Sequence, residues 1–205
     1  MLVTFEGPEG AGKTTIISLI KEKLIMQGFL VCMTREPGSG AIGGLIRETL
    51  LHGEYLNAKT ELFLFLADRA QHVTEVLQPA IKSGKIVLCD RYIDSTIVYQ
   101  GYGRGFDLKL LKQFNEMATD GLRPDLTILL DIDPRIGLQR QQKKDRLDQE
   151  SLEFHQKVRQ GFLDETKQEP ERWKVIDASL SLEEVSSQVY EIILKHIKIM
   201  AVSKK

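Results

Sequence analysis

Long hydrophobic runs and an excess of charge of one sign are both missing from this sequence. Its longest purely apolar stretch near the middle is the six-residue LFLFLA, far too short for a membrane-spanning helix. Lysine and arginine number 28 against 29 aspartates and glutamates, a net charge of −1. No basic excess therefore points to nucleic acid or to an anionic membrane, and any affinity for anions must come from local clusters.

Cysteine is also scarce. Cys32 and Cys89 are the only two in the sequence, and each lies in an apolar run that is typical of a buried strand. We expect two inert core thiols in a reducing compartment. The first residues enter a predicted strand at once, so we expect no signal peptide and a cytoplasmic protein.

Repeats, low-complexity segments and linkers rich in Pro, Gly or Ser are absent too, so residues 1–205 predict a single domain. Short, β-branched apolar runs alternate with longer helical patterns, which is typical of parallel strands covered on both faces. This order predicts an α/β fold with one doubly wound parallel sheet. The expected strands are 2–6, 29–34, 85–90, 125–132 and 174–177, and the expected helices are 13–27, 41–52, 58–83, 94–102, 107–120, 134–142, 149–168 and 181–199.

A phosphate-binding loop follows the first expected strand. Its sequence GPEGAGKT matches the P-loop pattern G-x-x-x-x-G-K-[ST] and opens a helix, as the chemistry requires. The glycines let the backbone form a nest of N–H donors, and the helix N-terminus adds positive potential. Lys13 would reach the β- and γ-phosphates, and the Thr14 hydroxyl would bind Mg²⁺. The alternative is a glycine-rich turn before an ordinary helix. The predicted triphosphate-binding residues here are Gly7, Pro8, Glu9, Gly10, Ala11, Gly12, Lys13, Thr14 and Thr15.

Asp90 and Arg91 end the third apolar run, at the edge where open α/β sheets bind ligands. Asp90 is placed to act on Mg²⁺, directly or through water, and Arg91 can clamp a phosphate with two hydrogen bonds. A helix-capping aspartate followed by a surface arginine is the simpler alternative.

Two helical faces carry further candidates. Phe65 and Arg69 are four residues apart, so a ring and a guanidinium could together stack and hydrogen-bond a base. Thr96, Tyr99 and Gln100 share another face. The alternatives are a core position for Phe65 and an ordinary amphipathic helix for the second set.

Six segments resemble bacterial thymidylate kinases in order and spacing: TFEGPEGAGKTT, TREPG, LFLFLADRAQH, LCDRYIDSTIVYQG, RPDLTILLDI and RLDQESLEFH. The resemblance covers about residues 2–195. It implies a P-loop nucleoside monophosphate kinase fold with five parallel strands, a homodimer packed through helices, and Mg²⁺-dependent transfer of a phosphoryl group from ATP to dTMP.

The acid Glu9 inside the P-loop is unexpected, because a fixed negative charge weakens phosphate binding. The resemblance implies that Glu9 turns toward the acceptor and contacts its 3′-hydroxyl or groups near the metal. This loop has no extra basic residue for the transferred group, so the resemblance places a catalytic cation in a lid at about 138–150. The candidates are Arg140, Lys143, Lys144 and Arg146, with Arg140 and Arg146 favoured. A solvated helix end is the alternative for this run.

The resemblance also implies an acceptor site and a donor-base site. Thymine would stack on Phe65, with Arg69 at O4 and Thr96 or Gln100 at the N3 edge, while Tyr99 would lie against the sugar. We expect a cis peptide bond at Glu36–Pro37. The predicted dTMP-binding residues are Glu9, Arg35, Glu36, Pro37, Arg47, Phe65, Arg69, Arg91, Thr96, Tyr99 and Gln100, and adenine is expected near Asp177 and Ala178.

Two other functions stay open from the residues alone. A kinase for another monophosphate or for a deoxynucleoside should lack the set Phe65, Arg69 and Gln100. A nucleotide-dependent switch belongs to a different class, and the DxxG and NKxD patterns of switch GTPases do not occur here.

Overall fold

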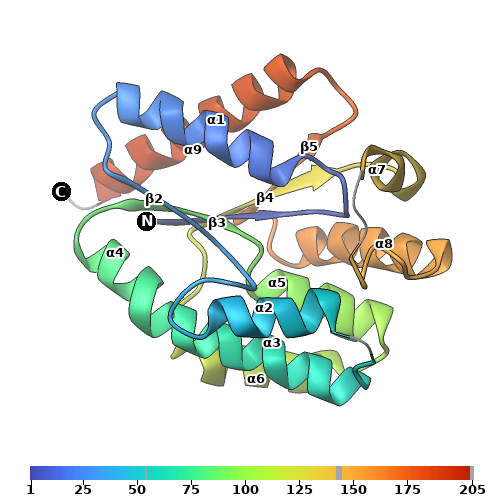
Figure 1. The fold of residues 1–205 in the computed structure, drawn as a ribbon. Helices are drawn as coiled ribbons and strands as arrows, with labels where there is room; N and C mark the ends of the chain where they lie inside the picture. Colours follow the sequence, from blue (N-terminus) through green and yellow to red (C-terminus); the bar gives the residue numbers. More distant parts are fainter. Residues whose placement is uncertain (54, 142–144, 204–205) are drawn as a thin grey trace.

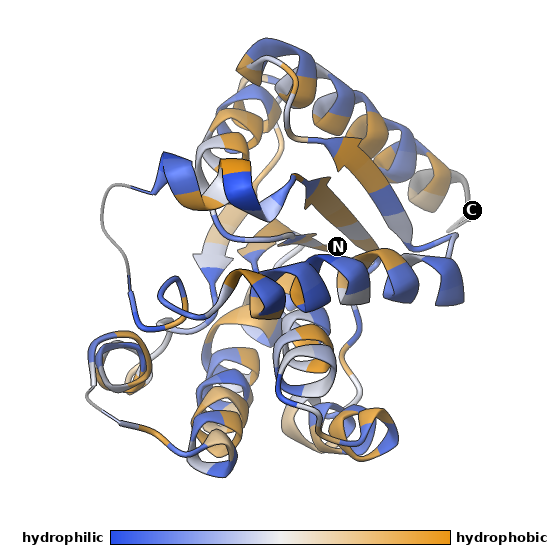
Figure 2. Cartoon of the chain, turned by 90° about the vertical axis from the view of Figure 1, so that its right-hand side faces the viewer, coloured by the Kyte–Doolittle hydropathy of each residue, from blue (hydrophilic) through white to orange (hydrophobic). Residues whose placement is uncertain are grey.

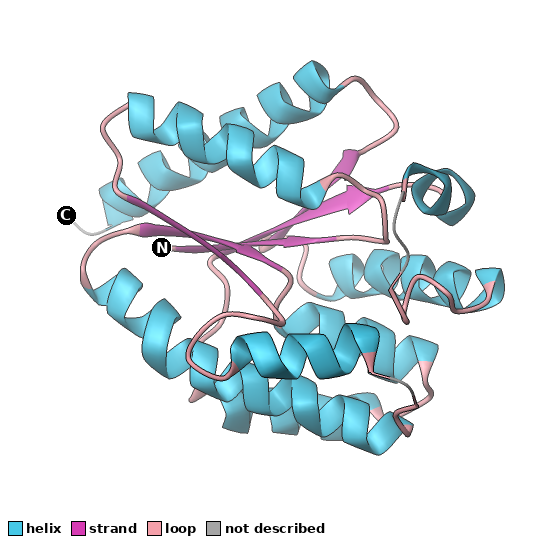
Figure 3. Cartoon of the chain, viewed as in Figure 1, coloured by secondary structure: helices cyan, strands magenta, loops and turns pink. Residues whose placement is uncertain are grey.

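The computed structural model describes residues 1–53, 55–141 and 145–203. These residues form a five-stranded sheet in the order β2-β3-β1-β4-β5, and every strand pair is parallel. Figure 3 shows the strands in one sheet with helices on both sides. The predicted doubly wound parallel sheet is confirmed. The strands are β1 Leu2–Glu6, β2 Val31–Arg35, β3 Ile86–Asp90, β4 Leu126–Asp131 and β5 Trp173–Asp177.

Helices enclose the sheet in two layers, as Figure 1 shows. α1 (Lys13–Met26) and α9 (Leu182–Ser203) pack together on one face. Most of the other helical segments cover the opposite face, and α7 lies beside one edge of the sheet. No helix among the described residues is long and apolar enough to cross a membrane. The other segments are α2 Gly43–His52, α3 Ala58–His72, η1 Val73–Leu77, α4 Gln78–Lys82, α5 Ile93–Thr96, η2 Ile97–Gly103, α6 Leu108–Thr119, α7 Pro134–Arg140 and α8 Leu152–Gln168.

The parallel register brings three predicted motifs to one edge of the sheet. Phe5 of β1 pairs with Asp90 of β3, and Arg35 of β2 pairs with the same aspartate. The P-loop after β1, the turn after β3 and the TREPG segment at the end of β2 are therefore neighbours. This is the carboxyl edge, where an open parallel sheet binds its ligands.

Hydrophobic cores on both faces hold the helices to the sheet. Every residue of β1 is buried, and Figure 2 shows hydrophobic residues along the strands. Ile16 of α1 and Ile193 of α9 are buried against one face. On the other, the fully buried Phe162 of α8 packs edge-to-face on Tyr99, with 6.2 Å between ring centroids. Burial from both sides explains why the strands lack polar alternation.

Two predicted helices are interrupted by π-helical turns. The expected helix 58–83 consists of α3, the π-helical segment η1 and α4, and the expected helix 94–102 consists of α5 followed by the π-helical segment η2. A π-helical turn adds one residue to a helical turn, which hydrophobic periodicity does not reveal, and such turns are frequent at functional sites. Tyr99 and Gln100 of the predicted acceptor site lie in η2.

The cysteines lie in strands, but only one is a core residue. Cys89 in β3 is fully buried, with its thiol 3.1 Å from the carbonyl oxygen of Arg91. Cys32 in β2 is only partly buried, so its predicted core position is wrong. The reason is that β2 is an edge strand and pairs with β3 alone.

Phe162→Ala should lower the free energy of unfolding by about 3–5 kcal/mol, because it removes a fully buried ring from the core beneath α8. Urea unfolding followed by circular dichroism would measure the loss. Met26→Ala is a matched control at a side chain that is 78% exposed, and it should change stability by less than about 0.5 kcal/mol. Equal effects of the two substitutions would contradict this assignment of the core.

Candidate active site

A cavity of about 560 Å³ opens at the carboxyl edge of β1, β2 and β3. Glu9 to Thr15 of the P-loop line one part of it, and Asp90 and Arg91 lie beside them. Residues from α2, α3, α5 and η2 line another part, and Arg140 of α7 and three residues of the segment 145–148 also face it. The cavity therefore joins the P-loop to most of the predicted acceptor residues.

The P-loop backbone packs directly on its neighbours, which explains two of its glycines. Gly7 and Gly10 have φ angles of +142° and +69°, in the range that favours glycine. A Cβ on Gly7 would lie 2.3 Å from the carbonyl oxygen of Leu130 in β4, and one on Gly10 would lie 1.9 Å from that of Gly137 in α7. Gly7 and Pro8 themselves lie outside the cavity lining.

Lys13 lies across the loop that precedes it. Its Nζ donates to the carbonyl oxygens of Gly7 at 2.9 Å and Pro8 at 3.0 Å, and its side chain is buried. Burial and the nearby Arg91 guanidinium lower the pKa of Lys13, while Glu9 and Asp90 oppose this shift. The ammonium is thus held against the backbone of the predicted phosphate-binding loop.

Thr14 and Asp90 meet although 76 positions separate them. The Thr14 hydroxyl donates to Oδ2 of Asp90 at 2.8 Å. A hydroxyl beside a carboxylate supplies oxygen ligands of the kind that Mg²⁺ prefers, with substrate phosphates completing its coordination. Among the described residues no group of three or more His, Cys, Asp or Glu side chains could hold a metal ion. The pair fits a nucleotide-bound magnesium ion better than a metal held by protein alone.

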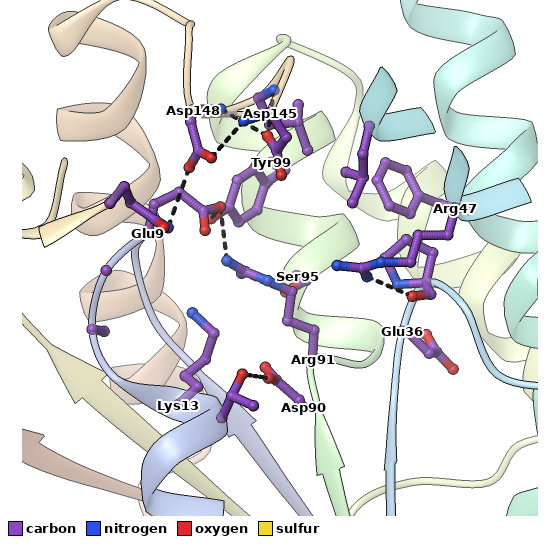
Figure 4. A pocket seen from close by; sticks show the side chains of 18 of the residues that line it. Glu9, Lys13, Glu36, Arg47, Asp90, Arg91, Ser95, Tyr99, Asp145 and Asp148 are labelled. Atoms are coloured by element: carbon purple, nitrogen blue, oxygen red, sulfur yellow. Dashed lines mark hydrogen bonds and ion pairs between the residues drawn. The ribbon is translucent and has the colours of Figure 1, made fainter. Parts of the chain in front are cut away.

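The acid of the P-loop forms an ion pair with the arginine that follows β3. Nη2 of Arg91 lies 2.7 Å from Oε1 of Glu9, and the Tyr99 hydroxyl donates to the same oxygen at 2.6 Å (Figure 4). The Arg91 guanidinium lies over the Tyr99 ring, 5.0 Å from its centroid. Burial opposes ionisation of Glu9, but Arg91, Lys13 and the Tyr99 hydrogen bond outweigh it and lower its pKa to about 2. Glu9 is therefore charged at any physiological pH.

A second acid, Glu6, supports the turn that carries Arg91, and the sequence reasoning missed it. Arg91 adopts a left-handed conformation with φ +67°. Oε1 of Glu6 accepts the backbone N–H of Tyr92 at 2.8 Å, and Oε2 accepts the Ser95 hydroxyl at 2.5 Å. Burial and the neighbouring Asp94 raise the pKa of Glu6 to about 7. A charged residue at the end of a strand predicted to be buried was the available signal.

The predicted acceptor residues converge on a buried network. Nε of Arg69 donates to Glu36 at 2.8 Å, and its Nη1 donates to Thr96 at 2.7 Å. The Glu36–Pro37 bond is cis, as predicted. Arg47 Nη1 donates to the Pro37 carbonyl oxygen at 2.8 Å. The cavity is lined by these predicted acceptor residues: Glu36, Pro37, Arg47, Phe65, Arg69, Thr96, Tyr99 and Gln100.

The lid candidates are divided between two places. Arg140 lines the cavity, and its Nη1 donates to the carbonyl oxygen of Ala178 at 3.1 Å. Arg146 lies outside the lining, where its guanidinium is 2.6 Å from Glu61 and 3.0 Å from the Leu50 carbonyl oxygen. Lys143 and Lys144 fall outside the described residues.

Three other predicted residues lie outside the cavity lining. Arg35 is exposed at the end of β2. Asp177 is exposed and accepts hydrogen bonds from Ser179, whereas Ala178 is buried. Conversely, Asp145, Leu147 and Asp148 line the cavity without having been predicted. Asp145 lies within the basic run 140–146 and the other two follow it, and only the folded structure brings them to the cavity.

Fold and site together define a P-loop phosphotransferase of the nucleoside monophosphate kinase type. A parallel five-stranded sheet presents the P-loop, its lysine and the hydrogen-bonded pair of Thr14 and Asp90 beside a separate set of polar residues and an aromatic ring. A switch or motor protein needs only one nucleotide site, whereas this cavity extends from the P-loop to polar residues of α2, α3, α5 and η2.

The chain belongs to the thymidylate kinase family. A sequence model of the family described as Thymidylate kinase matches residues 5–189. The thymidylate kinase of a Synechococcus species is 48% identical over 193 residues, which cover 94% of each chain, and that of Desulfovibrio desulfuricans is 48% identical over 97% of each. The crystal structure of thymidylate kinase from Ehrlichia chaffeensis superposes with a TM-score of 0.80 at 36% identity, covering 95% of this chain and 98% of that one.

The Glu9–Arg91 ion pair predicts a specific acid sensitivity. The pKa of Glu9 falls from about 4.5 to about 2 on folding, so the stabilisation it gives is complete above pH 4.5 and is lost as the pH falls toward 2. Between pH 6 and pH 2, the free energy of unfolding of the native protein should fall by about 3 kcal/mol more than that of a Glu9→Gln variant. Parallel urea titrations at several pH values would measure this, and equal losses would refute it.

The contact between α7 and the P-loop predicts that Gly137→Ala weakens binding of ATP. A Cβ on Gly137 would lie 2.1 Å from the carbonyl oxygen of Glu9, so the loop must shift. Because misplaced contacts are costly at such sites, we expect the dissociation constant to rise about tenfold or more. Gly44→Ala is the control, since nothing lies within 4 Å of its added Cβ. Calorimetric titration with ATP would give both values, and unchanged affinity in Gly137→Ala would contradict the prediction.

Proposed function

We propose that this protein transfers the γ-phosphoryl group of ATP to the 5′-phosphate of dTMP, giving ADP and dTDP. The observation that carries the proposal is the cavity that the P-loop shares with the predicted acceptor residues, with the Glu9–Arg91 ion pair between them. Membership of the thymidylate kinase family supports the choice of acceptor.

Catalysis would depend on positioning and charge neutralisation. The acceptor phosphate has a second pKa near about 6, so it is largely a dianion at neutral pH and needs no general base. Lys13 and the P-loop N–H groups would hold the donor phosphates, while Arg91 and Arg47, both in the cavity lining, would hold the acceptor phosphate. Arg35 is a weaker candidate, because it lies outside that lining.

Thr14 and Asp90 would hold Mg²⁺, which neutralises charge on the donor phosphates when bound. Glu9 would contact the 3′-hydroxyl of the sugar, and the hydrogen bond that it accepts from Tyr99, the predicted sugar neighbour, supports this role. Adenine would lie on the Ala178 side of the cavity, where the Arg140 guanidinium already lies.

Arg140 is our candidate for the lid cation. Its side chain reaches the cavity next to Ala178, whereas the guanidinium of Arg146 is occupied by Glu61 and a backbone carbonyl. Arg140→Met should therefore lower kcat more than Arg146→Met does.

We also propose that the enzyme works as a homodimer in the cytoplasm. Large apolar side chains are exposed on the neighbouring helices α2, α3 and α6, among them Leu45, Phe63 and Met117. Exposed apolar side chains on adjacent helices are the kind of surface that protein interfaces use. Sedimentation at micromolar concentration would test the assembly.

Release of ADP from Mg·ATP should accelerate strongly with dTMP and only slightly with dGMP or dCMP. Recognition of one methyl group discriminates between substrates by only about 1–3 kcal/mol, so dUMP should be a poorer acceptor rather than an excluded one. Coupled spectrophotometric assays of all four monophosphates, with a sample lacking acceptor, would test this. Equal ADP release with and without every monophosphate would refute the kinase and favour a hydrolase or a switch.

A further inference from the structure

Glu61 of α3 is a buried carboxylate that contacts three side chains from two other segments of the chain. Its side chain is 1% exposed. Oε1 accepts from the Gln100 amide at 3.0 Å and from Arg104 Nε at 3.3 Å, while Oε2 accepts from Arg104 Nη2 at 3.2 Å and from Arg146 Nη2 at 2.6 Å. Glu61 itself does not line the cavity, whereas Gln100 does.

Two guanidinium groups keep Glu61 ionised. Burial by itself would raise its pKa, but the hydrogen bonds from Arg104 and Arg146 outweigh burial, and the pKa is lowered. An ionised carboxylate has no proton to donate, so every partner of Glu61 must be a donor. This restriction applies to Gln100 as well.

The restriction determines which way the Gln100 amide faces. A primary amide carries an NH₂ donor on one side and a carbonyl acceptor on the other, and the two can exchange places by a flip. Because only the NH₂ group can bond to Glu61, the carbonyl oxygen of Gln100 is turned away from Glu61, toward the cavity that this residue lines. The wall of the cavity therefore presents a hydrogen-bond acceptor at this position.

Arg69 presents a donor on the same wall. Four of its five N–H groups bond to Glu36, Thr96, Asn115 and the carbonyl oxygen of Tyr92, so one N–H is left for a ligand. Thr96 lies one helical turn before Gln100, which places the donor and the acceptor close together along the cavity wall.

A donor beside an acceptor distinguishes between pyrimidines. Thymine and uracil present an O4 acceptor beside an N3–H donor, whereas cytosine presents an N4 amino donor beside an N3 acceptor. We infer that Glu61 is a specificity-determining residue, which holds the Gln100 amide so that the acceptor site takes thymine or uracil and rejects cytosine at two adjacent positions. This inference rests on the proposed function, because it concerns the base of the acceptor.

The isosteric substitution Glu61→Gln tests this role. An amide at position 61 can donate as well as accept, so the Gln100 amide can flip and offer its NH₂ to N3 of cytosine. The ratio of kcat/KM for dTMP to that for dCMP should fall by about tenfold or more, because cytosine would no longer leave a buried polar group without a hydrogen bond at this position. The dTMP to dUMP ratio should stay within about twofold, since these bases share the same edge.

Two further variants separate orientation from general damage. Arg104→Met removes one guanidinium from Glu61 but leaves its carboxylate opposite Gln100, so it should keep the dTMP to dCMP ratio even if activity falls. The double variant Glu61→Gln, Gln100→Glu again presents a hydrogen-bond acceptor to the cavity. It should recover most of the discrimination between dTMP and dCMP that Glu61→Gln loses. Circular dichroism would check that each variant folds.

The outcomes distinguish the two levels of the proposal. An unchanged dTMP to dCMP ratio in a folded Glu61→Gln variant, or equal loss in Arg104→Met, would overturn the role of Glu61 while leaving the kinase intact. A native protein with no preference for dTMP over an acceptor-free control would instead refute the proposed function itself.

Discussion

The ion pair between Glu9 and Arg91 joins the two halves of the cavity, and the rest of the site depends on it. Four cationic side chains line this cavity, namely Lys13, Arg47, Arg91 and Arg140. Cations gathered in this way repel each other. Arg47 illustrates the cost, since burial and the charges of Arg35 and of Arg91 lower its pKa. Glu9 offsets part of this repulsion and holds Arg91 in a fixed direction. An acid inside a phosphate-binding loop is thus compatible with anion binding, because its charge is balanced by an arginine that follows the neighbouring strand.

Buried carboxylates have a common role around this cavity. Glu6 holds the turn of Arg91, Glu36 holds the guanidinium of Arg69, and Glu61 holds the amide of Gln100. In each case an acid that is almost fully buried orients a residue that faces the ligand space. Side chains oriented in this way lose little conformational entropy when a ligand binds, so more of the interaction energy contributes to affinity for the substrate.

Most of the architecture could be predicted from local patterns. The expected strand 2–6 coincides with β1, and the expected helix 13–27 differs from α1 by one residue at its end. Hydrophobic runs and the P-loop were sufficient there, because buried parallel strands and glycine-rich turns have distinctive compositions. The π-helical turns η1 and η2 could not be predicted, since one extra residue in a helix hardly changes its periodicity. The partial exposure of Cys32 depends on β2 being an edge strand, which no local pattern reveals.

The sequence by itself determined the P-loop, the five apolar strands, the pair Asp90 and Arg91, and the candidates Phe65, Arg69 and Gln100 for a second ligand. Spacing along the chain carries this information, because glycine geometry and side-chain periodicity are local properties. Only the tertiary structure decided that Glu9 pairs with Arg91, that Gly137 packs on the loop and that Arg146 contacts Glu61 instead of the cavity. These partners are separated by more than 80 residues, so their contacts arise from strand order and helix packing rather than from any motif.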